Sequence, residues 1–92
     1  SLFAGDNTAD ERMAAFLVGL SRRLAARGFS PRRFQLTMPR TDIANYLRQA
    51  PETVSRVLRR FEKDGVLHIK QRDVEIVDMP RLEALALAIL RE

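Results

Sequence analysis

The sequence predicts a winged helix-turn-helix, a mainly α-helical fold with a small β component. Three observations lead to this fold class. Apolar residues recur at helical spacing in four separate segments. Two of the expected helices are separated by only Gln49 and Ala50. The second of them is followed by two short strand-like runs that predict a β-hairpin, and this succession is typical of a winged helix-turn-helix.

The chain has 92 residues, of which 46% are hydrophobic and 30% charged, which fits one small soluble domain. It has no cysteine, which excludes disulfides and thiolate chemistry in this chain and fits a cytoplasmic protein. No apolar run approaches the roughly 20 residues of a membrane span, so no membrane partner is expected. Because the chain does not begin with Met, we expect further sequence upstream, with residues 1–8 as a stub and residues 9–92 as the domain.

The first expected helix extends from about Ala9 to Arg27. Thr8 and Glu11 have the spacing of a capping box, with Asn7 as a competing cap. Gly28 is a natural residue to stop the helix. The apolar stripe of this helix consists of Met13, Phe16, Leu17, Leu20 and Leu24.

A short strand is expected next, because apolar and polar residues alternate from Phe34 to Met38. Pro39 should end it. Thr41 can then cap a short helix from Asp42 to about Arg48, in which Asp42 is simply a favourable acid near the helix N-terminus.

The recognition helix of this fold class is expected at about residues 51–64. Pro51 suits the first turn, where its missing N–H costs nothing. The inward stripe follows helical spacing and consists of Val54, Val57, Leu58 and Phe61.

A hairpin is expected at about residues 66–77, with strands at Val66–Lys70 and Val74–Val77 and a turn at Gln71–Asp73. Asp78 can cap a last helix that starts near Pro80. The residues on one side of that helix are Leu82, Leu85, Ala86 and Ile89.

Charge is unevenly distributed along the chain. From Ser21 to Arg60 there are ten basic residues and two acids, whereas the remainder has a net charge of −4. A basic middle favours a polyanionic partner such as nucleic acid. A merely solvated basic surface is the alternative, and charge alone favours neither.

The polar side of the recognition helix carries Glu52, Arg56, Arg59 and Lys63. One interpretation is a solvated face with a Glu52–Arg56 ion pair worth about 0.2–0.5 kcal/mol. The other is base reading, because a carboxylate accepts from cytosine N4–H and an arginine pairs with guanine O6 and N7.

Residues near the start of a recognition helix reach base edges, so Glu52, Ser55 and Arg56 are candidates for base reading. The candidates for phosphate contacts are Arg40, Arg59, Lys63, Lys70 and Arg72.

The stretch Glu52-Thr53-Val54-Ser55-Arg56 resembles the recognition motif of the CRP/FNR family of bacterial transcription regulators. The resemblance covers the chain from Ala9 to about Ala86 and includes ADERMAAF, LSRRLAARGFS and LTMPRTDIANYL. Pro51 and Ser55 favour the FNR-like branch, because the cyclic-AMP-receptor branch has Arg and Gly there.

The resemblance implies a DNA-binding domain that reads a TTGAT-like half-site of a palindrome through Glu52, Ser55 and Arg56. The positions that it implies near phosphates are Arg40, Thr41, Thr53, Arg59, Lys70 and Arg72. Three residues depart from the family pattern. Arg48 occupies a position that is usually Gly, and Gln49 one that is commonly apolar. Ala50 occupies the position of a usual Ser or Thr cap.

The family also implies a homodimer, double-stranded DNA and RNA polymerase as partners, and action as an activator. It implies an upstream dimerisation helix and a sensor domain. An iron–sulfur cluster or another effector would belong to that sensor, and no cofactor is expected in this chain. A cyclic-nucleotide- or haem-sensing member is the alternative within the family.

From a different class, the chain could be a winged-helix module that binds a protein partner through the Leu82–Ile89 helix. An enzyme is disfavoured, because no nucleophile–base pair, phosphate-cradling Gly loop or metal-ligand set is evident. His68 is expected to be a structural or surface residue, and Tyr46 is expected to pack in a helix interface rather than to stack on a base. The aromatic residues expected in a core are Phe16, Phe29, Phe34 and Phe61.

Overall fold

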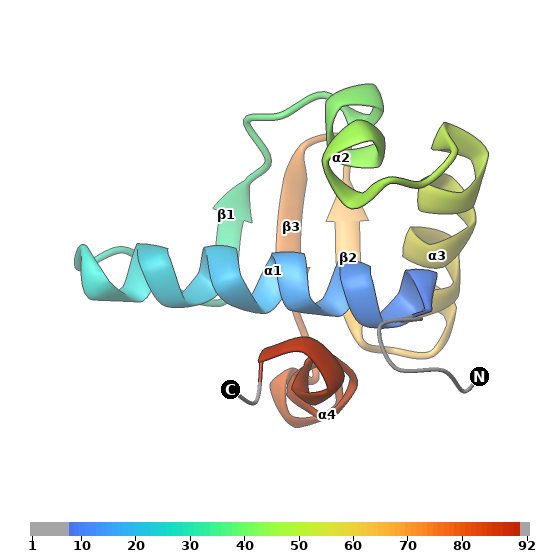
Figure 1. The fold of residues 1–92 in the computed structure, drawn as a ribbon. Coiled ribbons are helices and arrows are strands. Elements are labelled where there is room, and N and C mark those ends of the chain that lie inside the picture. The colour runs from blue at the N-terminus through green and yellow to red at the C-terminus, as the bar shows by residue number, and fades with distance from the viewer. Residues whose placement is uncertain (1–7, 91–92) are drawn as a thin grey trace.

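A computed structural model describes residues 8–90. The elements are α1 (Ala9–Ala26), β1 (Arg33–Gln35), α2 (Arg40–Leu47), α3 (Pro51–Lys63), β2 (Leu67–Lys70), β3 (Asp73–Ile76) and α4 (Met79–Leu90). In Figure 1, α1 crosses the ends of the three strands, α2 and α3 stand beside them, and α4 lies next to α1. The winged helix-turn-helix fold is thus confirmed.

The start and the end of α1 follow the local signals. The Thr8 hydroxyl accepts a hydrogen bond from Glu11 N at 3.1 Å, and the Glu11 carboxylate accepts one from Thr8 N at 3.0 Å. Gly28 has a φ of 86°, which suits glycine and ends the helix. Residues 1–7 of the expected stub, which include the competing cap Asn7, lie outside the described residues. Thr8, the last residue of that stub, is the N-cap of α1.

A strand is expected at Phe34–Met38, but the observed strand, β1, extends only from Arg33 to Gln35. The expectation is therefore wrong for Leu36–Met38. β1 pairs antiparallel with β3, and Gln35 lies opposite Asp73, the first residue of β3. Beyond Gln35 the partner strand has ended, and the last contact is Leu36 N donating to Arg72 O at 2.8 Å. The apolar alternation that continues to Met38 reflects burial of loop side chains, with Leu36 only 2% exposed.

The expected cap at Thr41 is also wrong. α2 begins at Arg40 with Pro39 as its N-cap, and no side chain caps this end. Pro39 has an extended ψ of 157°, and Ile43 N donates to Pro39 O at 3.0 Å, which places Thr41 inside the first turn.

The connection between α2 and α3 contains a residue in the left-handed region. Arg48 has φ 58° and ψ 46°, and its N–H bonds back to Asn45 O at 3.1 Å. This conformation costs a residue with a Cβ about 1–2 kcal/mol, and glycine avoids that cost. The backbone therefore explains physically why glycine suits this position.

We expect Arg48→Gly to raise the free energy of unfolding by about 0.5–1 kcal/mol, because the relief of strain exceeds the extra chain entropy of glycine. Urea denaturation measures the change. Arg48→Ala is the matched control, since it removes the guanidinium and keeps the strain. A glycine variant no more stable than the alanine variant would contradict the expectation.

The core contains the inward stripes of the helices and the inner face of the sheet. Leu82 and Ala86 of α4 are buried against α1, and the Asp78 carboxylate accepts from Arg81 N at 3.1 Å, which confirms the expected cap. The expectation for Phe29 is wrong, since this ring is 57% exposed. It follows the turn at Gly28, which directs the ring outward, where it lies 5.5 Å from the Arg27 guanidinium.

The sheet has the strand order β1-β3-β2, and all its pairs are antiparallel. β2 and β3 form the wing, which we define as residues 67–76. Its turn is Gln71–Arg72, with Gln71 at φ 58°. The hairpin is therefore confirmed, with Asp73 in the strand and not in the turn.

Candidate nucleic-acid interface

α3 is anchored by one face and exposed on the other. Its predicted inward stripe is 1–4% exposed, while Glu52, Arg56, Arg59 and Lys63 are all exposed. Thr53 and Ser55 are half-buried. The polar face of the helix is thus open to a partner, as the spacing predicted.

The N-terminus of α3 is uncapped. Ala50 is the N-cap residue and makes no side-chain hydrogen bond, and Pro51 occupies the first turn. The first N–H groups of a helix have no partner within the helix. Those at Glu52 and Thr53 therefore suit water or an anion beside the base-reading candidates.

Glu52 and Arg56 do not form the ion pair considered as the solvated alternative. Within residues 8–90 the salt bridges are Arg33–Glu75, at 3.3 Å, and Arg60–Asp10. The Glu52 carboxylate and the Arg56 guanidinium are therefore not bound to each other.

Several arginines of the basic middle have structural roles that the sequence did not reveal. Arg60 pairs with Asp10 of α1. Arg32 donates to Ile76 O at 3.1 Å and to Val77 O at 2.8 Å, where it ties the loop before β1 to the end of β3. Arg60 is thus paired with an acid, and N–H groups of Arg32 are used within the fold, so fewer guanidinium donors remain for a polyanion than the residue count suggests.

Three of the predicted site residues meet at one place. Arg40 from α2 and Ser55 and Arg59 from α3 line a small hollow of about 130 Å³, whose remaining wall is Leu58, Glu62 and Ile69. Arg40 also donates to Gln71 O in the wing turn at 3.1 Å. This contact connects the start of α2 to the wing, next to the exposed Arg72.

Other predicted residues lie apart from this cluster. Lys63 lies at the far end of α3, about 16 Å along the helix axis from Glu52. Side chains alternate along β2, so Lys70 lies on the opposite side of the sheet from Ile69. It lines another hollow with His68 and Glu75. Thr41 is exposed in the first turn of α2.

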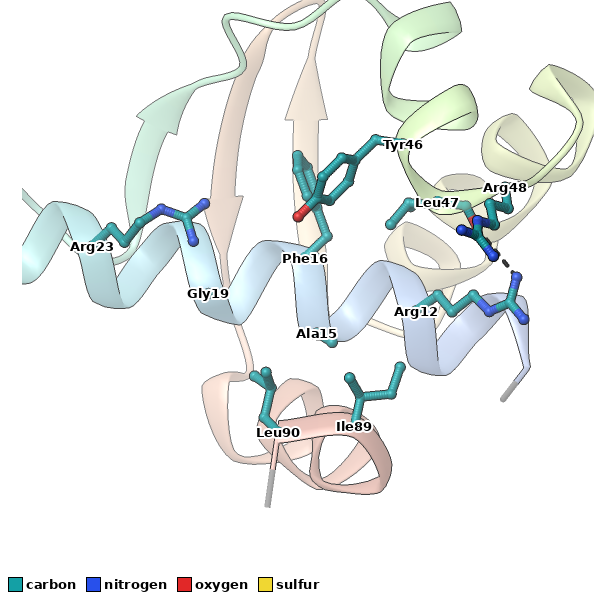
Figure 2. A pocket seen from close by; sticks show the side chains of 10 residues that line it. All are labelled: Arg12, Ala15, Phe16, Gly19, Arg23, Tyr46, Leu47, Arg48, Ile89 and Leu90. Carbon is teal, nitrogen blue, oxygen red and sulfur yellow. Dashed lines mark hydrogen bonds between the residues drawn. The ribbon is translucent and has the colours of Figure 1, made fainter. Parts of the chain in front are cut away.

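A larger hollow, of about 460 Å³, lies between α1, the end of α2 and the end of α4 (Figure 2). None of the residues that line it comes from α3 or the wing. The ring centroids of Phe16 and Tyr46 lie 5.8 Å apart at its edge, so Tyr46 packs on α1 although it is 69% exposed. Arg12 donates to Leu47 O at 3.2 Å, the dashed line in Figure 2.

Within the part of the chain that the structure describes, no group of three or more His, Cys, Asp or Glu side chains could hold a metal ion. No helix between residues 8 and 90 has the length and hydropathy needed to cross a bilayer.

The sequence model of the protein family described as the Crp-like helix-turn-helix domain matches residues 11–85 of this chain. The chain belongs to this family. The Crp-like domain is 52% identical over 85 residues to the fumarate and nitrate reduction regulatory protein of Salmonella typhimurium, covering 92% of this chain and 34% of that protein. It is 51% identical, over 92% of this chain and 35% of the relative, to the transcriptional activator protein Anr of Pseudomonas aeruginosa.

Solved structures agree with the family. FixK2 from Bradyrhizobium japonicum superposes with a TM-score of 0.75 and 39% identity, over 91% of this chain and 41% of that one. DNR from Pseudomonas aeruginosa gives a TM-score of 0.65 and 27% identity, over 83% and 34%.

The Crp-like domain therefore spans about a third of the length of the curated relatives that it matches. It is the DNA-binding domain of a CRP/FNR-type regulator, and its relatives are regulatory proteins rather than enzymes.

Proposed function

We propose that this domain binds double-stranded DNA in a sequence-specific way and reads a TTGAT-like half-site of a palindrome. The observation that carries the proposal is the exposed N-terminal half of α3. There Glu52, Ser55 and Arg56 lie on a helix fixed by its buried stripe, and neither charged side chain forms a salt bridge within residues 8–90.

In this proposal the three residues differ in what they read. Arg56 pairs in a bidentate manner with guanine O6 and N7, and Glu52 accepts from cytosine N4–H. Ser55 can donate or accept at either kind of base edge. An acid at this place weakens non-specific phosphate binding, so its presence favours base reading over a purely electrostatic contact.

Phosphate contacts set the register of the protein on the duplex and carry no sequence information directly. Around α3 and the wing, the residues proposed for them are Arg40, Thr41, Thr53, Arg59, Lys63, Lys70 and Arg72. Arg40 keeps donors for a phosphate besides the one bound to Gln71 O, because a guanidinium has five N–H groups.

For the longer regulator we propose a homodimer, since a palindrome mirrors a two-fold axis. We also propose contact with RNA polymerase and activation of transcription, in line with the name of Anr. An iron–sulfur cluster or another effector would be held outside this chain, which has no cysteine.

A gel shift at several salt concentrations tests the proposal. The domain should bind a TTGAT palindrome at least about tenfold more tightly than a scrambled duplex of equal length. Equal binding of the two would remove the half-site assignment. Binding to neither duplex at low salt would favour a protein-interaction module.

Arg72→Ala is expected to weaken binding to all DNA sequences alike, because the exposed wing turn contacts backbone and not bases. The slope of log K against log salt should fall by about 0.9 for each phosphate that the variant no longer neutralises. Arg22→Ala, an exposed arginine on α1, is the matched control for the removal of one charge. An unchanged slope in the Arg72 variant would exclude a phosphate contact by Arg72.

A further inference from the structure

A carboxylate of α3 holds the outer edge of the wing. β2 is an edge strand, because the sheet order is β1-β3-β2. Every second N–H of such a strand points away from its partner. One of these, Ile69 N, donates to Glu62 Oε2 at 3.0 Å, and Glu62 is half-buried where it does so.

This hydrogen bond joins the helix proposed to read bases to the hairpin proposed to contact phosphates. A second link, from Arg40 to Gln71 O, holds the wing turn to α2. Two side-chain links thus hold the wing, one at its edge from α3 and one at its tip from α2, in addition to the backbone pairing of β3 with β1 and the bond from Leu36 N to Arg72 O. Of these two side-chain links, only the hydrogen bond from Ile69 N to Glu62 connects the wing to α3, because the other link comes from α2.

The same carboxylate shares a hollow with two guanidinium groups. Glu62 lines the hollow with Arg40 and Arg59, yet it forms no salt bridge with either of them among the residues described. Oε2 of Glu62 is used by the strand N–H, and neither guanidinium forms a salt bridge with this carboxylate among the residues described.

We propose that Glu62 is a positioning residue that sets the placement of the wing relative to α3, so that Arg72 reaches the DNA backbone while α3 lies in the groove. This inference rests on the DNA-binding function proposed above. It predicts that the contribution of Arg72 depends on the acceptor at position 62, although the two side chains belong to different elements.

Hydrogen exchange tests the structural half of the inference without DNA. In Glu62→Ala the Ile69 amide should exchange about tenfold faster or more, as expected for removal of a hydrogen bond to a charged acceptor. The amides of His68 and Lys70 should not change, because they point toward β3. Glu62→Gln keeps an acceptor oxygen and should keep most of the protection. Faster exchange at all three amides, or at none, would overturn local positioning by Glu62.

A double-mutant comparison tests the functional half. Arg72→Ala should lower the salt slope by about 0.9 in the unaltered chain and in Glu62→Gln, and by clearly less in Glu62→Ala. An equal decrease of the slope in all three backgrounds would overturn the inference and leave Glu62 as a contributor to stability alone.

The two proposals can fail separately. If Arg72→Ala changes no slope even in the unaltered chain, the proposed phosphate contact of Arg72 fails, and the functional half of this inference fails with it. DNA binding by α3 would remain supported by selectivity for the palindrome. The Ile69 exchange rate would still decide whether Glu62 holds the strand.

Discussion

The Arg56→Ala domain is expected to bind its specific site about 1–3 kcal/mol more weakly and to lose selectivity at one guanine. Arg56 is exposed on α3 and forms no salt bridge within residues 8–90. Its removal would therefore delete the proposed contact with DNA without leaving a salt-bridge partner unpaired in the protein. The weakening should appear on the specific site and largely disappear on random DNA.

Competition titrations measure this effect. The domain and its variant are titrated with the TTGAT palindrome and with duplexes in which one base pair at a time is replaced. Arg59→Ala is the matched control on the same helix face, and it should weaken binding to all duplexes alike. Equal weakening by Arg56→Ala on specific and random DNA would count against base reading by this residue.

Leu82→Ala is expected to lower the free energy of unfolding by about 2–5 kcal/mol, because it leaves a cavity between α4 and α1. The Leu82 side chain is 0% exposed and belongs to the hydrophobic core cluster formed by residues 13–86. α1 is the main packing partner of α4, so this leucine decides how firmly the last helix is held.

The same helix offers a matched control. Leu87 is 53% exposed, so Leu87→Ala makes the same chemical change at the surface and should alter stability by no more than about 0.5 kcal/mol. Urea denaturation of both variants measures the difference. Similar destabilisation in the two would contradict the assignment of Leu82 as the anchor of α4.

Features that depend on neighbours in the sequence could be predicted. The capping box of Thr8 and Glu11, the stop at Gly28, Pro51 at the start of α3 and the stripe from Val54 to Phe61 follow from short-range rules. The exposure of the polar side of α3 follows from the same periodicity. The side of α3 on which the base-reading candidates lie therefore follows from the sequence alone.

Features set by contacts distant in sequence could not. Nothing near Asp10 indicates that it pairs with Arg60, and nothing near Arg32 indicates that it bonds the end of β3. The end of β1 depends on where its partner β3 begins. Glu62 is an acid on a basic helix, but only the edge position of β2 shows what it binds.

The first two turns of α1 have a mechanical consequence for the whole helix-turn-helix. Arg12 holds the last carbonyl of α2, and Asp10 holds Arg60 near the end of α3. The two contacts start from neighbouring turns of α1, so a displacement of this part of α1 would act on α2 and α3 at the same time. The start of α1 is thus attached by polar side chains to both helices of the helix-turn-helix, in addition to its packing in the core.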